Sequence, residues 1–195
     1  VAIGGAAALP LLSVGWFRDA VGMLNKTKPN LKELLEAKRD YPLSDADTES
    51  LLELSYSLIV LGKEYAPVKA GAAALIVSAA AGVGEEALFR GTLQHEVAGI
   101  AGDPGGLLVG ALVFGIAHGG VTPTYALQAA ATGAYFGYLY QEFGHTILVP
   151  AICHTIYDAT AFWVMHYQVS KSDEETQTDL LFQLKKALAE RNRGS

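Results

Sequence analysis

Residues 69–97 read KAGAAALIVSAAAGVGEEALFRGTLQHEV, and this stretch decides the fold. The part up to Gly84 is almost wholly small or aliphatic, and two carboxylates, Glu85 and Glu86, follow inside the same apolar run. Sixteen or more such residues in a row favour a helix surrounded by apolar material. We therefore predict one long helix whose charges lie buried in mid-course.

Four further stretches share this apolar character, at residues 1–24, 107–118, 124–140 and 146–167. About 20 residues at 1.5 Å each cross about 30 Å of hydrocarbon. The chain is 51% hydrophobic and 17% charged, against about 25% charged in soluble proteins, and its mean hydropathy is +0.26. These features predict an all-α fold, a polytopic membrane helix bundle with about five spans.

The remaining segments are predicted to be loops and surface helices. Residues 25–50 form a polar loop, and residues 51–62 are apolar but too short to cross, which favours an interfacial helix. In the tail, apolar residues recur at helical spacing, namely Leu180, Leu181, Leu184, Ala187 and Leu188. We predict a membrane helical domain over residues 1–167 and a polar amphipathic tail over 168–195 that lies on the membrane surface or on a partner.

The charge distribution orients the chain and excludes one class of partner. Of the 14 Lys and Arg residues, 12 lie in residues 25–69 or in the tail, and the positive-inside tendency assigns these segments to the cytoplasm, stroma or matrix. The net charge of -6 argues against a nucleic-acid partner. A single cysteine, Cys153, excludes an intrachain disulfide framework.

Ionisable side chains inside the apolar helices are the candidate functional residues, because a charge at the bilayer centre costs about 2.5–3.5 kcal/mol on insertion scales. Arg90 follows Glu86 by four residues, so the guanidinium and the carboxylate share a helix face and can pair. The neighbouring carboxylate, Glu85, is then the candidate general base.

Two further polar clusters lie on other apolar helices. His118 ends one apolar stretch, and His154 precedes Asp158 by four residues, which allows the acid to orient the ring. A single histidine in such a helix is more often a structural hydrogen-bonding group than a catalytic one, and the ion pair could likewise be structural. Three clusters that each bear an insertion cost instead favour one shared pocket.

Other polar residues rank lower as site candidates. Glu142 and His145 have the spacing found in di-iron bundles, but they occur once and in a short turn. His95, Glu96 and His166 fall near predicted helix ends, where polar residues are common. We expect none of them in the site.

Three motifs resemble those of a known family. Glu85–Gly91 resembles the EExxxR motif of the CAAX-processing and bacteriocin-processing intramembrane proteases, which include the type II CAAX prenyl endopeptidases. Phe114–His118 resembles their FxxxH motif, and His154–Asp158 resembles their HxxxN motif, in the same order along the chain. The resemblance covers residues 66–167.

The resemblance implies that Glu85 and His118 activate water, with the ion pair behind them in support. His154 and the residue four positions later would stabilise the oxyanion formed during peptide hydrolysis. That later residue is commonly Asn in prenyl endopeptidases, whereas this chain has Asp158, which puts a CaaX-type substrate in question.

The sequence leaves the cofactor open. The family has been called metalloprotease, and Glu85, His118 and His154 could hold a zinc ion, although no HExxH motif is present. Water polarised directly by Glu85 and His118 is equally consistent with these residues.

We expect an intramembrane endopeptidase that cuts a membrane-anchored peptide or protein, prenylated or otherwise hydrophobic. Two alternatives stay open: a proteolytically inactive scaffold or regulator of another membrane protein complex, and a metal-dependent redox protein. Relatives of this kind occur in several membranes, so we expect an integral membrane protein of the plastid thylakoid or envelope first, and otherwise of the bacterial plasma membrane or endoplasmic reticulum.

Overall fold

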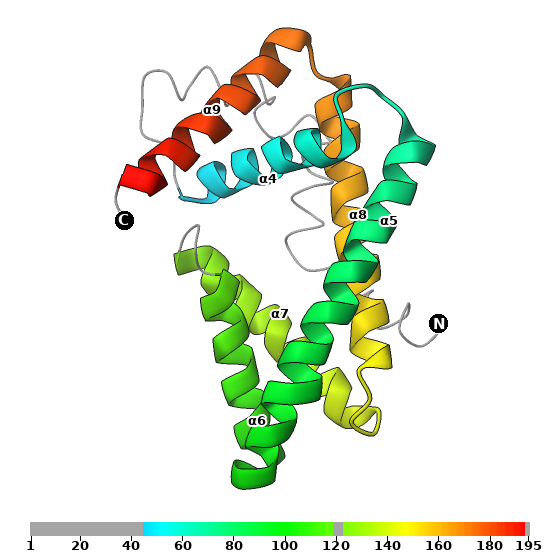
Figure 1. The fold of residues 1–195 in the computed structure, drawn as a ribbon, viewed down its shortest axis with the longest axis vertical. Coiled ribbons are helices and arrows are strands. Elements are labelled where there is room, and N and C mark those ends of the chain that lie inside the picture. Colours follow the sequence, from blue (N-terminus) through cyan, green and yellow to red (C-terminus); the bar gives the residue numbers. More distant parts are fainter. Residues whose placement is uncertain (1–44, 119–122, 194–195) are drawn as a thin grey trace. The chain divides into compact units, whose positions relative to one another are not determined.

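The computed structural model describes residues 45–118 and 123–193, and these are almost entirely helical (Figure 1). No strand occurs within these two ranges, so the predicted all-α class is confirmed for them. In chain order the elements are α4 (Asp45–Leu61), α5 (Pro67–Glu86), the π-helix η1 (Ala87–Gln94), α6 (His95–His118), α7 (Pro123–Glu142), α8 (Leu148–Lys171) and α9 (Glu174–Arg193).

The described residues divide into two compact units. The first unit contains residues 74–118 and 123–160, and the second contains residues 45–73 and 161–193. Helices α5 and α8 each contribute residues to both units. The predicted boundary after residue 167 falls inside α8, and the division into a membrane domain and a tail stays a prediction.

In the first unit, α5, η1 and α6 form one helical run that reverses direction at Gly102. The backbone there has φ 73° and ψ 169°, a conformation that essentially only glycine adopts. Beyond the reversal, Gly110 lies against Gln94, where a Cβ would come 3.3 Å from the glutamine side chain. Phe114 packs edge-on against Phe89 with ring centroids 4.9 Å apart. The two arms are therefore antiparallel.

Residues 87–94 depart from the sequence prediction because they are π-helical. At the end of this segment the backbone N–H of His95 donates to the carbonyl oxygen of Arg90, five residues earlier, which is the spacing of a π turn. The predicted long helix over 69–97 is continuous, but this segment of it is π-helical and not α-helical. Since a π turn holds more residues than an α turn, it changes the direction in which every later side chain points, Arg90 included.

Two described runs are long and apolar enough to cross a membrane. They are Pro67–His118, with 52 residues, and Leu148–Lys171, with 24 residues, and an 18-residue window of each has a mean hydropathy of 1.7 and 1.2, respectively. The reversal at Gly102 divides the first run into two arms, which match the predicted apolar stretches 69–97 and 107–118.

The total of about five spans stays a prediction. Residues 124–140 lie in α7, which is not one of the two runs. Residues 1–24 and most of the predicted polar loop lie outside the described residues.

In the second unit, α4 packs against α9. Leu180 of α9 is fully buried, and the Ser55 hydroxyl of α4 donates a 3.0 Å hydrogen bond to its carbonyl oxygen. The sequence assigned Leu180 to a stripe facing the membrane or a partner, but the side chain is buried within the chain itself. Residues 51–62 were predicted as an interfacial helix; residues 51–61 form the later part of α4, which is not one of the two runs long and apolar enough to cross a membrane.

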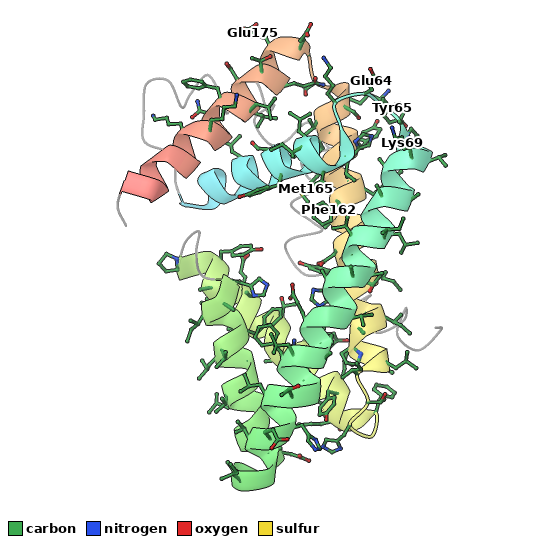
Figure 2. All side chains as sticks on the ribbon, in the orientation of Figure 1. Glu64, Tyr65, Lys69, Phe162, Met165 and Glu175 are labelled. Atoms are coloured by element: carbon green, nitrogen blue, oxygen red, sulfur yellow. The ribbon has the colours of Figure 1, made fainter. Side chains whose placement is uncertain are left out.

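Aromatic residues close the connection between α4 and α5. Tyr65, labelled in Figure 2, packs edge-on against Tyr167 of α8, with ring centroids 6.0 Å apart. The Lys171 ammonium lies 3.8 Å from the Tyr65 ring centroid, a cation–π contact. These contacts anchor the connection to the end of α8.

Candidate active site

The deepest part of the candidate site is an ion pair between Glu86, the last residue of α5, and Arg90 of η1. Arg90 Nη1 donates to Glu86 Oε1 at 3.0 Å, and both side chains are 0% exposed. Burying two charges is costly unless further hydrogen bonds satisfy the rest of each group. The surroundings of the pair therefore decide whether it is stable.

Helices α6 and α7 complete the surroundings of Arg90. Its Nη2 donates to the carbonyl oxygen of Gly133 at 2.7 Å. The rings of Phe114 and Phe136 have centroids 4.6 and 5.4 Å from the guanidinium carbon, within cation–π range. A Cβ on Gly133 would stand 3.0 Å from Phe114 Cδ1, so glycine at this position permits the close approach of α6 and α7.

His154 of α8, which is distant from the ion pair in the sequence, contacts the Glu86 carboxylate of that pair. Its Nδ1 donates to Glu86 Oε1 at 3.0 Å across a separation of 68 residues. Its Nε2 lies 3.3 Å from Asp158 Oδ2 and 4.0 Å from Glu85 Oε2. The Phe136 ring stacks on the imidazole at 4.7 Å. The ring is thus held in one orientation, and Asp158 is turned toward it.

Glu85 and His118 form the more accessible part of the site. His118 Nε2 lies 3.5 Å from Glu85 Oε2, and the two side chains are 28% and 32% exposed. His118 Nδ1 bonds to the carbonyl oxygen of Phe114 at 2.8 Å, and the Phe114 ring stacks on the imidazole at 4.2 Å. Since a carbonyl oxygen only accepts, Nδ1 carries the proton and Nε2 of the neutral ring presents a lone pair toward Glu85.

The structure thus brings together all six predicted site residues within the first unit, although they come from α5, η1, α6 and α8. Oε2 of Glu85 and Oε2 of Glu86 are buried and have no hydrogen-bond partner among the described residues. Buried polar atoms in native proteins nearly always have a partner. Of the two, only the Glu85 side chain is partly exposed, at 32%, so its oxygen is the one suited to accept from a water molecule or from a substrate.

Sequence reasoning missed a second polar contact between η1 and α7. Gln94 is 1% exposed, and its Nε2 donates to the carbonyl oxygen of Gly137 at 3.0 Å. It repeats, four residues further along each helix, the contact of Arg90 with Gly133. The signal was present as the 86-90-94 spacing and as two glycines four residues apart, which allow close helix packing in membranes.

The lower-ranked polar residues make other contacts. His145, in the turn after α7, lies 3.2 Å from Asp103, and His95 contacts the Tyr140 hydroxyl at 3.1 Å. His166 belongs to the second unit, where its Nε2 accepts a backbone N–H at 3.4 Å.

The donor set was tested against the predicted zinc ion. Among the described residues, no group of three or more His, Cys, Asp or Glu side chains is arranged to hold a metal ion. His154 already engages Glu86 through Nδ1 and approaches Asp158 through Nε2. Glu85, His118 and His154 as placed are therefore not arranged as a zinc site.

Comparison with known proteins agrees with the motif resemblance. Residues 67–160 match the family model described as type II CAAX prenyl endopeptidase Rce1-like. The match covers slightly less than half of the chain and includes all six site residues. The match supports a family of the CAAX-processing type for this chain, and the members of that family are membrane-integral proteases. No curated protein and no solved structure matches the chain.

Proposed function

We propose that this protein is an intramembrane endopeptidase that hydrolyses a peptide bond with water activated by Glu85 and His118. The observation that carries the proposal is the position of Glu85 Oε2, which is buried, lacks a hydrogen-bond partner and lies 3.5 Å from His118 Nε2. That separation is longer than a direct hydrogen bond of about 2.9 Å. One water molecule can contact both atoms.

The two acceptors give such a water a defined orientation. A carboxylate oxygen of Glu85 and the lone pair of His118 Nε2 each accept one of its hydrogens, since His118 Nδ1 is committed to the Phe114 carbonyl. The oxygen lone pairs then point away from both acceptors, toward an incoming carbonyl carbon. Attack transfers one water proton to Glu85 as the new C–O bond forms.

The charge that develops on the carbonyl oxygen needs a hydrogen-bond donor. His154 supplies one at Nε2 when the ring is doubly protonated, a form that the carboxylates of Glu86 and Asp158 on its two nitrogens stabilise. In the free protein this N–H faces Asp158 at 3.3 Å, and the oxyanion shares it during the reaction. Asp158 lies turned toward the imidazole, so its charge is shared with His154. When the C–N bond breaks, Glu85 returns its proton to the leaving amine.

In this proposal the buried ion pair acts on the reaction through His154. Arg90 holds Glu86 at 3.0 Å, and Glu86 holds His154 at 3.0 Å through the same carboxylate oxygen. Pre-oriented donors in a site shielded from water stabilise a transition state without reorganising. Glu86 and Arg90 are therefore positioning residues, whereas Glu85, His118 and His154 are the catalytic residues.

The substrate class proposed from the family is a membrane-anchored peptide or protein, prenylated or otherwise hydrophobic. The bond would be presented from the bilayer or from one face of it. The experiment is cleavage of a panel of lipidated and hydrophobic peptides by purified protein in detergent, with mass spectrometry to locate the cut.

Wild type is compared with Glu85→Gln, which keeps the shape of the side chain but removes the base. We expect the rate to fall by about 10²–10⁴-fold, the usual contribution of a general base. Glu96→Gln, at an exposed position in the first turn of α6, is the matched control and should keep wild-type activity. Equal cleavage by Glu85→Gln and wild type would exclude the mechanism. A folded wild type that cleaves nothing would favour a scaffold.

A further inference from the structure

Acidic residues greatly outnumber basic residues in the first unit. Residues 74–160 contain a single Lys or Arg, which is Arg90, against six acidic residues. Arg90 is 0% exposed and is held by Glu86 and the Gly133 carbonyl. No ammonium or guanidinium of this segment is therefore free to meet a substrate.

The accessible part of the site carries two carboxylates. The Glu85 side chain is 32% exposed and that of Asp158 is 26% exposed. Their oxygens lie 4.0 and 3.3 Å from the same atom, His154 Nε2. A carboxylate accepts at about four lone-pair positions, so one imidazole N–H leaves Asp158 with acceptor capacity to spare.

A separate observation indicates that this region receives hydrogen-bond donors from outside the chain. The buried Glu85 Oε2, which lies 4.0 Å from His154 Nε2, has no hydrogen-bond partner among the described residues. Together with the unshared capacity of Asp158, acceptors outnumber donors around His154 Nε2. A ligand that complements the site brings N–H groups and positive charge.

We propose that the substrate carries a positively charged residue next to the scissile bond, and that Asp158 is the residue that selects it. This inference rests on the proposed function, in which the scissile carbonyl oxygen faces His154 Nε2. The residues flanking that carbonyl then lie against Asp158, where attraction between opposite charges is strengthened by the low local dielectric. An acidic flanking residue is repelled for the same reason.

A free carboxylate on the substrate is disfavoured for the same reason. A CaaX-type substrate ends in a carboxylate a few residues after the cleaved bond, and residues 74–160 offer it no accessible Lys or Arg. A cationic internal sequence suits this site better than an anionic chain terminus. Asp158, where prenyl endopeptidases commonly have Asn, is the residue of this chain that accounts for the difference.

The test uses matched hydrophobic peptides with Lys, Gln or Glu at each of the two positions flanking the cut. For wild type in detergent, we expect kcat/KM for the Lys peptide to exceed that for the Gln peptide by about tenfold or more at one position. This factor corresponds to the usual contribution of a hydrogen bond to a charged group. The Glu peptide should be the poorest. Equal kcat/KM for Lys and Gln at both positions would overturn the inference and leave the protease intact.

The variant measurement uses ratios, because Asp158 also contacts His154. In Asp158→Asn the Lys-to-Gln ratio should fall to near one, whatever happens to the absolute rates. Asp103→Asn is the control, since Asp103 is 52% exposed and pairs with His145 in the same unit; its ratio should stay at the wild-type value. A ratio unchanged in Asp158→Asn would assign the selection elsewhere and refute the role of Asp158. Cleavage of none of the peptides would count against the proposed function itself.

Discussion

Replacing Arg90 with methionine should destabilise the protein strongly, because the change leaves the Glu86 carboxylate buried without its cation. The two side chains are 0% exposed and 3.0 Å apart. Removing one partner of a buried ion pair costs about 3–5 kcal/mol, and the 2.7 Å hydrogen bond to the Gly133 carbonyl is lost as well. We expect the free energy of unfolding to fall by about 4 kcal/mol.

The double variant Glu86→Gln/Arg90→Met removes the uncompensated charge together with the cation. Glutamine keeps an oxygen that accepts from His154 Nδ1. The double variant should therefore lose about 2 kcal/mol less than Arg90→Met alone, a coupling of the size measured between groups in one polar network.

Both free energies are obtained by titrating the protein in mixed micelles with sodium dodecyl sulfate and following the helical circular dichroism. Leu88→Met is the control, because Leu88 lies in the same π-helix but is 59% exposed, and it should change the midpoint little. Equal losses in Arg90→Met and the double variant would refute the reasoning, since the Glu86 charge would then gain nothing from Arg90.

Three further predictions concern packing and chemistry. In α5, Gly82→Ala places a Cβ 2.8 Å from Thr155 Oγ1 and 3.1 Å from α8 backbone atoms. It should lower the free energy of unfolding by about 1–3 kcal/mol in the same titration. The control Gly84→Ala meets no atom within 4 Å and should be neutral or slightly stabilising. In α9, Leu180→Ala removes a fully buried side chain and should lower the free energy of unfolding by about 2–5 kcal/mol, which is measured as faster proteolysis of the tail. The control Phe182→Ala changes a side chain that is 62% exposed and should leave the proteolysis rate unchanged. Peptide cleavage should survive exhaustive chelation, because the proposed mechanism activates water with Glu85 and His118 directly; activity lost to the chelator and restored by zinc would contradict this.

The apolar helices and the pairing of polar residues within each motif could be predicted from the sequence because both depend on local spacing. Glu86 and Arg90, like His154 and Asp158, are four residues apart, and the spacing predicted that each pair is in contact, as observed at 3.0 and 3.3 Å. The joint occurrence of three motifs on apolar helices also predicted the family, which the match over residues 67–160 confirms.

The π-helix and the burial of the tail were not predictable in this way. A period of 3.6 describes regular α-helices, so it missed the wider turn at residues 87–94 and the altered direction of the side chains there. The same period correctly predicted a helix in the tail. It did not say which partner buries the apolar stripe, and for Leu180 that partner is α4 of the same chain.

By itself the sequence determined which side chains are polar, which helix each belongs to, and which of them share a face. The tertiary structure decided which helices meet. It brings Glu86 to His154 across 68 residues, Glu85 to His118, and the Arg90 guanidinium to the Gly133 carbonyl. These contacts depend on how closely the helices approach each other. Glycine permits a close approach because it has no Cβ, but only the tertiary structure determines which neighbour packs against it.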